Sequence, residues 1–119
     1  MEIIVTPGRR IMGRLAKGDD LLLALEQRCL EAGIKLAEVR AIGAVSQARV
    51  GFYDQEKRKY DFLEMKKPLE ILALVGNVSL KDGKPMVHAH ITLGDAQGRA
   101  FGGHLAEGTR VFACEFEIQ

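Results

Sequence analysis

All three histidines of the chain fall within one short window, at His88, His90 and His104. Neutral imidazole is the commonest protein ligand for zinc and related metals. Two histidines that are one residue apart on a β-strand project from the same face, so one ion can reach both. A third histidine on a facing strand would supply a third ligand. The sequence therefore predicts a divalent-metal site, with zinc as the first choice and nickel or another borderline metal as the alternative.

An ion held by three histidines can be catalytic or structural. An open fourth position is typical of hydrolytic zinc sites, in which the metal acidifies a bound water. A fourth protein ligand or a neighbouring subunit would instead close the coordination sphere. Five residues are candidates for the surroundings of the ion: Glu70, Asn77, Gly102, Gly103 and Glu115. Because no nucleophile, base and orienting group stand together, we assign no catalytic residue and favour a non-catalytic role.

The segment that carries the first two histidines reads as a strand with two different faces. Its core face comprises Val87, Ala89, Ile91 and Leu93. The histidines alternate with these residues and are therefore expected to face solvent, a cleft or a partner subunit. Asp82-Gly83 predicts a tight hairpin turn just before this strand, because Asp-Gly readily supplies positive φ angles.

The first half of the chain predicts one helix between strands. A short strand is expected around Ile3–Thr6 and a second one over Arg10–Leu15. Apolar residues at helical spacing predict a helix over about residues 20–32, with Asp19 or Asp20 as its N-cap and Gly33 just past its end.

The remaining segments predict further strands. A strand is expected to break at Gly43 and another to run from 48 to 53, with 60–65 as its hairpin partner. A further strand is expected over 69–80, before the Asp82-Gly83 turn. The last strand, residues 110–118, places Phe112, Cys114, Phe116 and Ile118 on one face. The sequence thus predicts an α+β fold with a largely antiparallel or mixed sheet and one main helix. We expect a single domain over residues 1–119, with its core at about 10–118.

Composition and charge limit the function classes. The chain has 119 residues, 47% of them apolar, which suits one globular domain. Seventeen basic and sixteen acidic residues give a net charge of +1, which disfavours autonomous binding to duplex DNA. No apolar run approaches the roughly 20 residues of a membrane span, so no membrane partner is expected. Cys29 and Cys114 are interpreted as buried thiols, and a cytoplasmic location is the default.

Several motifs occur in the order found in the PPC domain, the plants-and-prokaryotes-conserved domain. They are Gly18-Asp19-Asp20-Leu21 before a helix, Ala41-Ile42-Gly43-Ala44, the segment 70–77, the segment 82–85 with His88-Ala89-His90, Gly102-Gly103-His104-Leu105 and a closing strand with Glu115. From about Arg10 onward nearly the whole chain resembles this family. The resemblance implies an α/β domain that assembles as a homotrimer. It also implies a metal site of the kind present in some prokaryotic members, carried here by the three histidines.

The resemblance also raises DNA association. Plant members carry the domain beside AT-hook motifs that grip DNA, while prokaryotic members are the domain alone. Here Pro7-Gly8-Arg9-Arg10 lacks the Arg-Gly-Arg-Pro core of an AT-hook. We therefore predict a homotrimeric, metal-binding domain with a regulatory or scaffolding role, associated with DNA or a DNA-associated protein only indirectly. The alternatives are a metal-dependent enzyme that acts on a small molecule at the same site, and direct DNA binding by the trimer.

Overall fold

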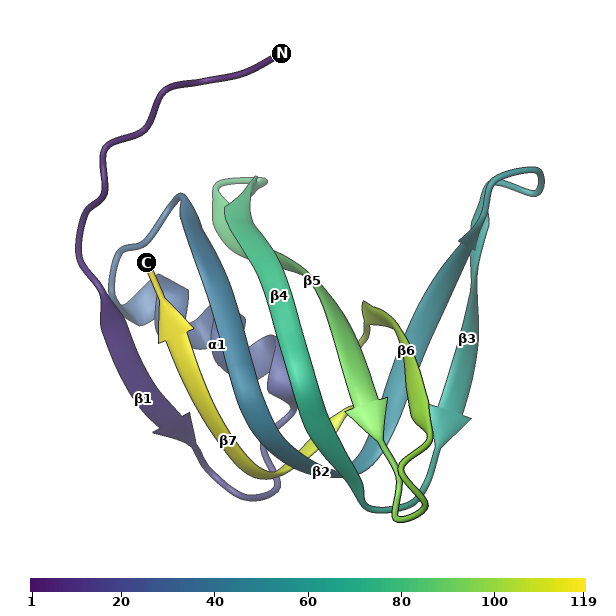
Figure 1. The fold of residues 1–119 in the computed structure, drawn as a ribbon. Helices are drawn as coiled ribbons and strands as arrows, with labels where there is room; N and C mark the ends of the chain where they lie inside the picture. Colours follow the sequence, from purple (N-terminus) through teal and green to yellow (C-terminus); the bar gives the residue numbers. More distant parts are fainter.

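The computed structural model describes residues 1–119 and consists of one sheet with a single helix packed on it. In chain order the elements are β1 (Ile11–Leu15), α1 (Leu21–Glu31), β2 (Ala37–Asp54), β3 (Lys59–Met65), β4 (Leu69–Lys81), β5 (Lys84–Gly94), β6 (Ala100–Leu105) and β7 (Arg110–Ile118). The seven strands run in the order β1-β7-β2-β4-β5-β6, and β3 is added through β2. Every pairing is antiparallel. Figure 1 shows α1 behind the sheet and the β2–β3 hairpin projecting at one end. The predicted single α+β domain is confirmed.

The helix covers the face of the sheet that forms the core. Leu21, Leu25 and Cys29 recur every four residues along α1 and are fully buried. The side chain of Asp20 caps the helix by accepting a hydrogen bond of 3.2 Å from the backbone N–H of Leu23. Gly33 follows the helix with a φ of +67°. The predicted helix and its caps are therefore confirmed. The structure has no helix with the length and apolar character of a membrane span.

Strand β2 connects the two halves of the sheet. Its first half pairs with β4 and β7, and its second half pairs with β3 and β6. The predicted break at Gly43 is wrong, because β2 continues through it as a β-bulge with a φ of +145°. A Cβ at this position would lie 2.1 Å from the carbonyl oxygen of Ala113, so only glycine fits here. The bulge bends the strand without ending it.

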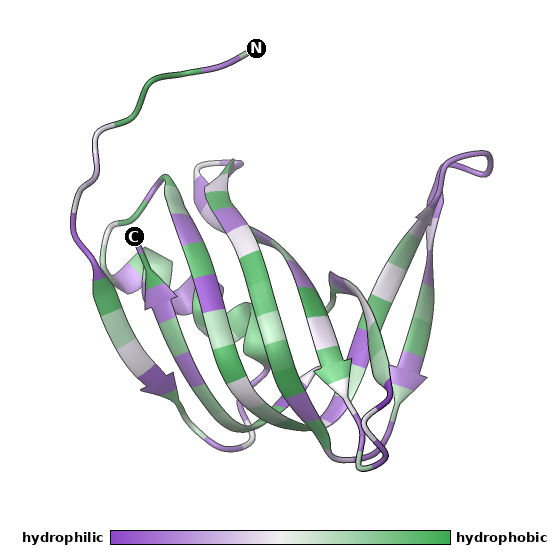
Figure 2. Ribbon diagram, viewed as in Figure 1, coloured by the Kyte–Doolittle hydropathy of each residue, from purple (hydrophilic) through white to green (hydrophobic).

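Two other expectations are corrected by the pairing. Residues 1–10 form no strand, because Ile3–Thr6 have no partner strand and remain exposed. In β7 the register with β2 shifts near its start, so Phe112 is 54% exposed while Cys114, Phe116 and Ile118 are buried. Strict alternation fails at Phe112 because a bulge changes the face on which the following residues lie. Figure 2 shows the alternation of polar and apolar residues that elsewhere divides each strand between two faces.

Candidate metal centre

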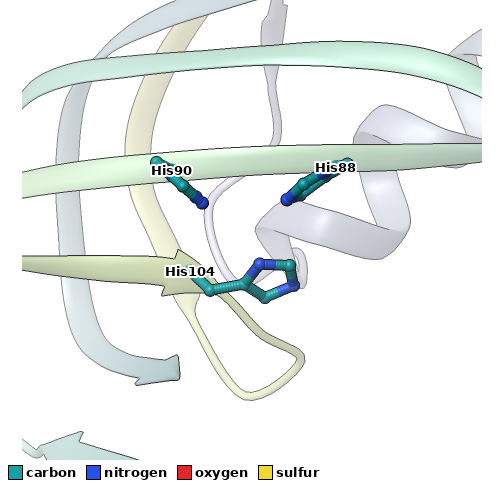
Figure 3. Close-up of side chains that lie close together, drawn as sticks. All are labelled: His88, His90 and His104. Atoms are coloured by element: carbon teal, nitrogen blue, oxygen red, sulfur yellow. The ribbon is translucent and has the colours of Figure 1, made fainter. Parts of the chain in front are cut away.

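Strands β5 and β6 bring the three histidines together. The two strands are antiparallel neighbours in which His90 lies directly opposite His104. His88 lies two residues before His90 on the same face of β5. Figure 3 shows the three side chains pointing toward one another from the two strands. One imidazole nitrogen from each residue lies within 4.8 Å of those of the other two.

The buried residues of β5 fix the direction of the first two histidines. Val87, Ala89 and Ile91 are at most 5% exposed and pack in the core. Since side chains alternate along a strand, His88 and His90 must point to the opposite face, where both are exposed. His104 is partly buried. The prediction that the histidines leave the core face is confirmed.

The geometry suits a tetrahedral ion. Zinc–nitrogen bonds of about 2.0–2.1 Å place two tetrahedral ligand atoms about 3.3 Å apart. The nitrogen atoms all lie within 4.8 Å of one another, so no pair exceeds that spacing by more than about 1.5 Å. The ring centroids lie 5.0 to 5.9 Å apart, so no other side chain separates the rings.

The surroundings of His104 favour its neutral imidazole form. Burial lowers the pKa of His104 below its ordinary value, and positive charge on His88 and His90 lowers it further. A lowered pKa keeps the ring neutral to more acidic pH. Neutral imidazole is the form that binds a metal ion, so the lowered pKa of His104 favours cation binding by this residue.

Two glycines let β6 come close to its neighbours. A Cβ at Gly103 would lie 2.8 Å from the carbonyl oxygen of Gly51 on β2, and a Cβ at Gly102 would lie 2.7 Å from the carbonyl oxygen of Ile91 on β5. Larger residues would push β6 away from β2 and β5. Gly102 and Gly103 therefore act through the backbone, by holding His104 beside β5.

The chain is similar to known proteins in sequence and in fold. The model of the Plants and Prokaryotes Conserved (PCC) domain, the PPC domain, matches residues 3–119. This chain belongs to that family. The resemblance seen in the motifs is confirmed, and the match extends seven residues before Arg10 at its N-terminal end.

Solved structures of PPC proteins share the whole fold. A protein of Archaeoglobus fulgidus described as metal-containing is 45% identical, with a TM-score of 0.92 over 99% of this chain and 84% of that chain. The PPC protein of Pyrococcus horikoshii is 39% identical, with a TM-score of 0.91 over 98% of this chain and 83% of that one. A candidate DNA-binding protein of Bacteroides thetaiotaomicron is 27% identical, with a TM-score of 0.88 over 97% of this chain and 80% of that chain.

A curated relative carries a similar segment inside a much longer protein. The bifunctional protein GlmU of Synechococcus sp. (strain JA-3-3Ab) is 42% identical over 103 residues, which is 83% of this chain. The aligned segment is 15% of the length of that relative. This chain therefore matches only a small part of the length of that relative.

The structure does not bring the two candidate carboxylates to the histidines. Glu70 lies opposite Gly94, four residues beyond His90 on β5, which is about 13 Å along the strand. Glu115 lies on β7, three strands away from β5 in the sheet order, which is about 14 Å across the sheet. Asn77, in contrast, lies directly opposite His88 on β4. The histidines thus have an amide beside them and neither of the predicted carboxylates.

Sequence reasoning missed the aromatic neighbour of the cluster. The Tyr60 ring lies 4.9 Å from the His104 ring, measured between centroids. Gly51 explains this contact, because it lies opposite His104 on one side and opposite Phe62 on the other. The only signal in the sequence was the alternation of Tyr60 and Phe62, which could not show that β2 would also pair with β6.

Proposed function

We propose that this PPC protein binds a divalent metal ion, with zinc as the first choice, through His88, His90 and His104. The observation that carries the proposal is the convergence of three imidazole nitrogens within 4.8 Å on two neighbouring strands. The metal-containing relative from Archaeoglobus fulgidus supports it at 45% identity. When bound, such an ion would supply a Lewis acid with one exchangeable position.

We further propose that the role of the site is regulatory or scaffolding rather than catalytic. Hydrolysis at a zinc ion needs a general base or a polarising group within reach of the bound water. Glu70 and Glu115 are the two carboxylates expected there. Glu70 lies about 13 Å from His90 along the strand direction, and Glu115 lies about 14 Å from β5 across the sheet. A metal-dependent enzyme remains the second candidate, because exposed histidines leave the fourth position open to a small molecule.

A homotrimer is part of the same proposal. Met12, Ile42, Leu72 and Val75 are each more than half exposed and line a groove of about 260 Å³ on the face of the sheet away from α1. Contiguous exposed apolar side chains are typical of a protein interface. Coverage by further copies of the chain would bury them. Light scattering coupled to size exclusion tests this, and a monomer at micromolar concentration would contradict it.

We propose that any DNA association is indirect. A cytoplasmic location is part of the proposal, because the free buried thiols Cys29 and Cys114 would stay reduced there. The Bacteroides thetaiotaomicron relative supports a link to DNA, whereas the net charge of +1 gives the chain little general attraction for phosphates. Direct binding by the trimer predicts a salt-dependent shift of random duplex DNA. We expect no shift at low salt, and a shift would favour the direct alternative.

The metal proposal is tested on protein purified without a histidine tag. We expect about one zinc per chain by elemental analysis and a higher melting temperature after zinc is added to the chelator-treated protein. The variant Glu115→Gln serves as a control on a strand remote from the histidines. Absence of stoichiometric metal together with no thermal shift would overturn the proposal.

A further inference from the structure

An aromatic wall stands on one side of the histidine cluster. Tyr60 contacts His104, and the rings of Tyr53 and Phe62 lie 5.2 Å and 5.9 Å from the ring of Tyr60, measured between centroids. The three aromatic side chains of this wall are between 41% and 47% exposed. They therefore offer open ring surface beside the position where an ion would sit. Gly51 lies beneath the wall, since a Cβ there would be 3.1 Å from ring carbons of Tyr60 and Phe62.

The cross-strand partners of the histidines carry no negative charge. Their partners across the neighbouring strands are Asn77 opposite His88, Val75 opposite His90 and Gly51 opposite His104. Three neutral imidazoles leave the full double charge of a divalent ion uncompensated. On the wall, the guanidinium of Arg49 lies 3.7 Å from the centroid of the Phe62 ring, and Glu64 lies directly opposite Arg49 on β3. The charge of the ion therefore favours an anion as the fourth ligand.

The opposite side of the cluster offers a hydrogen-bond donor. Residues directly opposite on antiparallel strands have Cβ atoms about 4.5–5.5 Å apart, so the exposed amide of Asn77 lies beside the ring of His88. An anion with two oxygen atoms can place one on the ion and accept a hydrogen bond from Asn77 with the other. This geometry fits a carboxylate.

We infer that the exchangeable position of the site binds a small aromatic carboxylate, with its carboxylate on the ion and its ring against Tyr60. The inference rests on the proposed metal function, because the carboxylate needs the ion as its main partner. The flat exposed rings of the wall distinguish an aromatic ligand from an aliphatic one, since stacked or edge-to-face aromatic pairs add to the affinity that burial provides.

The test uses the protein loaded with cobalt(II), whose visible absorption reports the number and type of its ligands. Benzoate, cyclohexanecarboxylate and acetate are titrated at neutral pH. The first two acids have similar size and the same donor atoms, but only benzoate has a flat aromatic ring. We expect benzoate to bind about three- to tenfold more tightly than cyclohexanecarboxylate. Equal affinity, or the reverse order, would overturn the inference.

Variants distinguish the contribution of the aromatic wall to carboxylate affinity from that of the Asn77 amide. In the cobalt-loaded variants, Tyr60→Ala should remove the preference for benzoate, whereas Tyr60→Phe should retain it. Phe112→Ala is the matched control, because Phe112 is an exposed aromatic residue on β7, three strands from β5. Asn77→Ala should weaken all three carboxylates alike, by about fivefold. A Tyr60→Ala protein that still prefers benzoate would contradict the assignment of the wall.

The two proposals can fail separately. If no histidine-bound cobalt spectrum develops, the metal function itself is wrong and the ligand inference falls with it. If cobalt binds to all three histidines but the three carboxylates bind equally or not at all, only the ligand inference is wrong. The comparison of benzoate with cyclohexanecarboxylate uses the wild-type chain, so it does not depend on the folding of any variant.

Discussion

Two polar clusters on the outer face of the sheet differ in how their charges are satisfied. In the first, the carboxylate of Glu117 accepts hydrogen bonds from Arg10 Nε at 2.6 Å and Nη2 at 2.9 Å, and a further one from Arg40. Glu117 is only 8% exposed, so these cations are the partners that its burial requires. In the second, three imidazoles converge with no carboxylate among their cross-strand partners.

The contrast separates a structural cluster from a functional one. The Glu117 cluster contains both signs of charge, so it joins the N-terminal segment to β7 without any outside group. The histidine cluster contains three potential metal ligands and no carboxylate among their cross-strand partners. Groups that converge without satisfying one another are typical of a binding site. The first cluster should govern stability, and the second should govern metal binding.

Removal of histidines gives the largest expected effect. It tests whether the histidine cluster governs metal binding. His88→Ala combined with His104→Ala leaves one imidazole, so zinc affinity should fall by at least about 100-fold. The fold should persist, because both side chains lie off the core face. A zinc-competition titration measures the affinity and circular dichroism checks the fold. Unchanged affinity would place the metal elsewhere.

Neutralising Glu117 tests the other side of the comparison. Glu117→Gln leaves Arg10 and Arg40 without their shared carboxylate, so the melting temperature should fall while the zinc stoichiometry stays the same. Glu115→Gln is the matched control, since Glu115 is exposed on the same strand. Loss of zinc from the Glu117 variant would show that the two clusters are not independent.

A smaller effect is expected when β6 is displaced from β2. The Cβ of Gly103→Ala would meet the carbonyl oxygen of Gly51 at 2.8 Å, so His104 should shift and zinc affinity should fall by about tenfold. Gly8→Ala is the control, because nothing lies within 4 Å of its Cβ. Isothermal titration calorimetry with zinc measures both variants. Equal affinities would mean that the position of β6 does not determine the zinc affinity of the site.

The pH dependence of stability provides the smallest and sharpest test. The hydrogen bond and charge of Arg10, followed by Arg40, hold the pKa of Glu117 below its ordinary value of 4.5. The stabilisation from this cluster is therefore complete above pH 4.5 and is lost as the pH falls through the lowered pKa. Acid unfolding of the wild-type protein should show this loss, and Glu117→Gln should show a flatter profile over the same window. Identical profiles would assign the acid sensitivity to other groups.

Local patterns predicted the parts of the site that depend on one strand or one turn. Alternation in β5 placed His88 and His90 on the face opposite Ala89, and the Asp82-Gly83 turn formed where expected, with φ angles of 52° and 77°. The helix was equally local, because its apolar spacing and its caps lie within one segment. These features follow from periodicity and turn chemistry, which the sequence displays directly.

Lateral placement in the sheet could not be predicted in this way. Glu70 and Glu115 were polar residues on apolar strands, but their distance from His90 depends on the strand order. The contact of Tyr60 with His104 depends on β2 pairing with β3 on one edge and β6 on the other. At the bulge, Gly43 lies close to Ala113 on β7, a neighbouring strand that is far away in the sequence. Such contacts are set by the whole sheet and not by any single segment.

The central claim is that one ion binds to all three histidines. A crystal structure of zinc-loaded protein, with anomalous scattering measured at the zinc edge, tests it most directly. The account predicts a single strong peak about 2.0–2.1 Å from one nitrogen each of His88, His90 and His104. A map without a peak among these three side chains, or with zinc held by other residues, would contradict it.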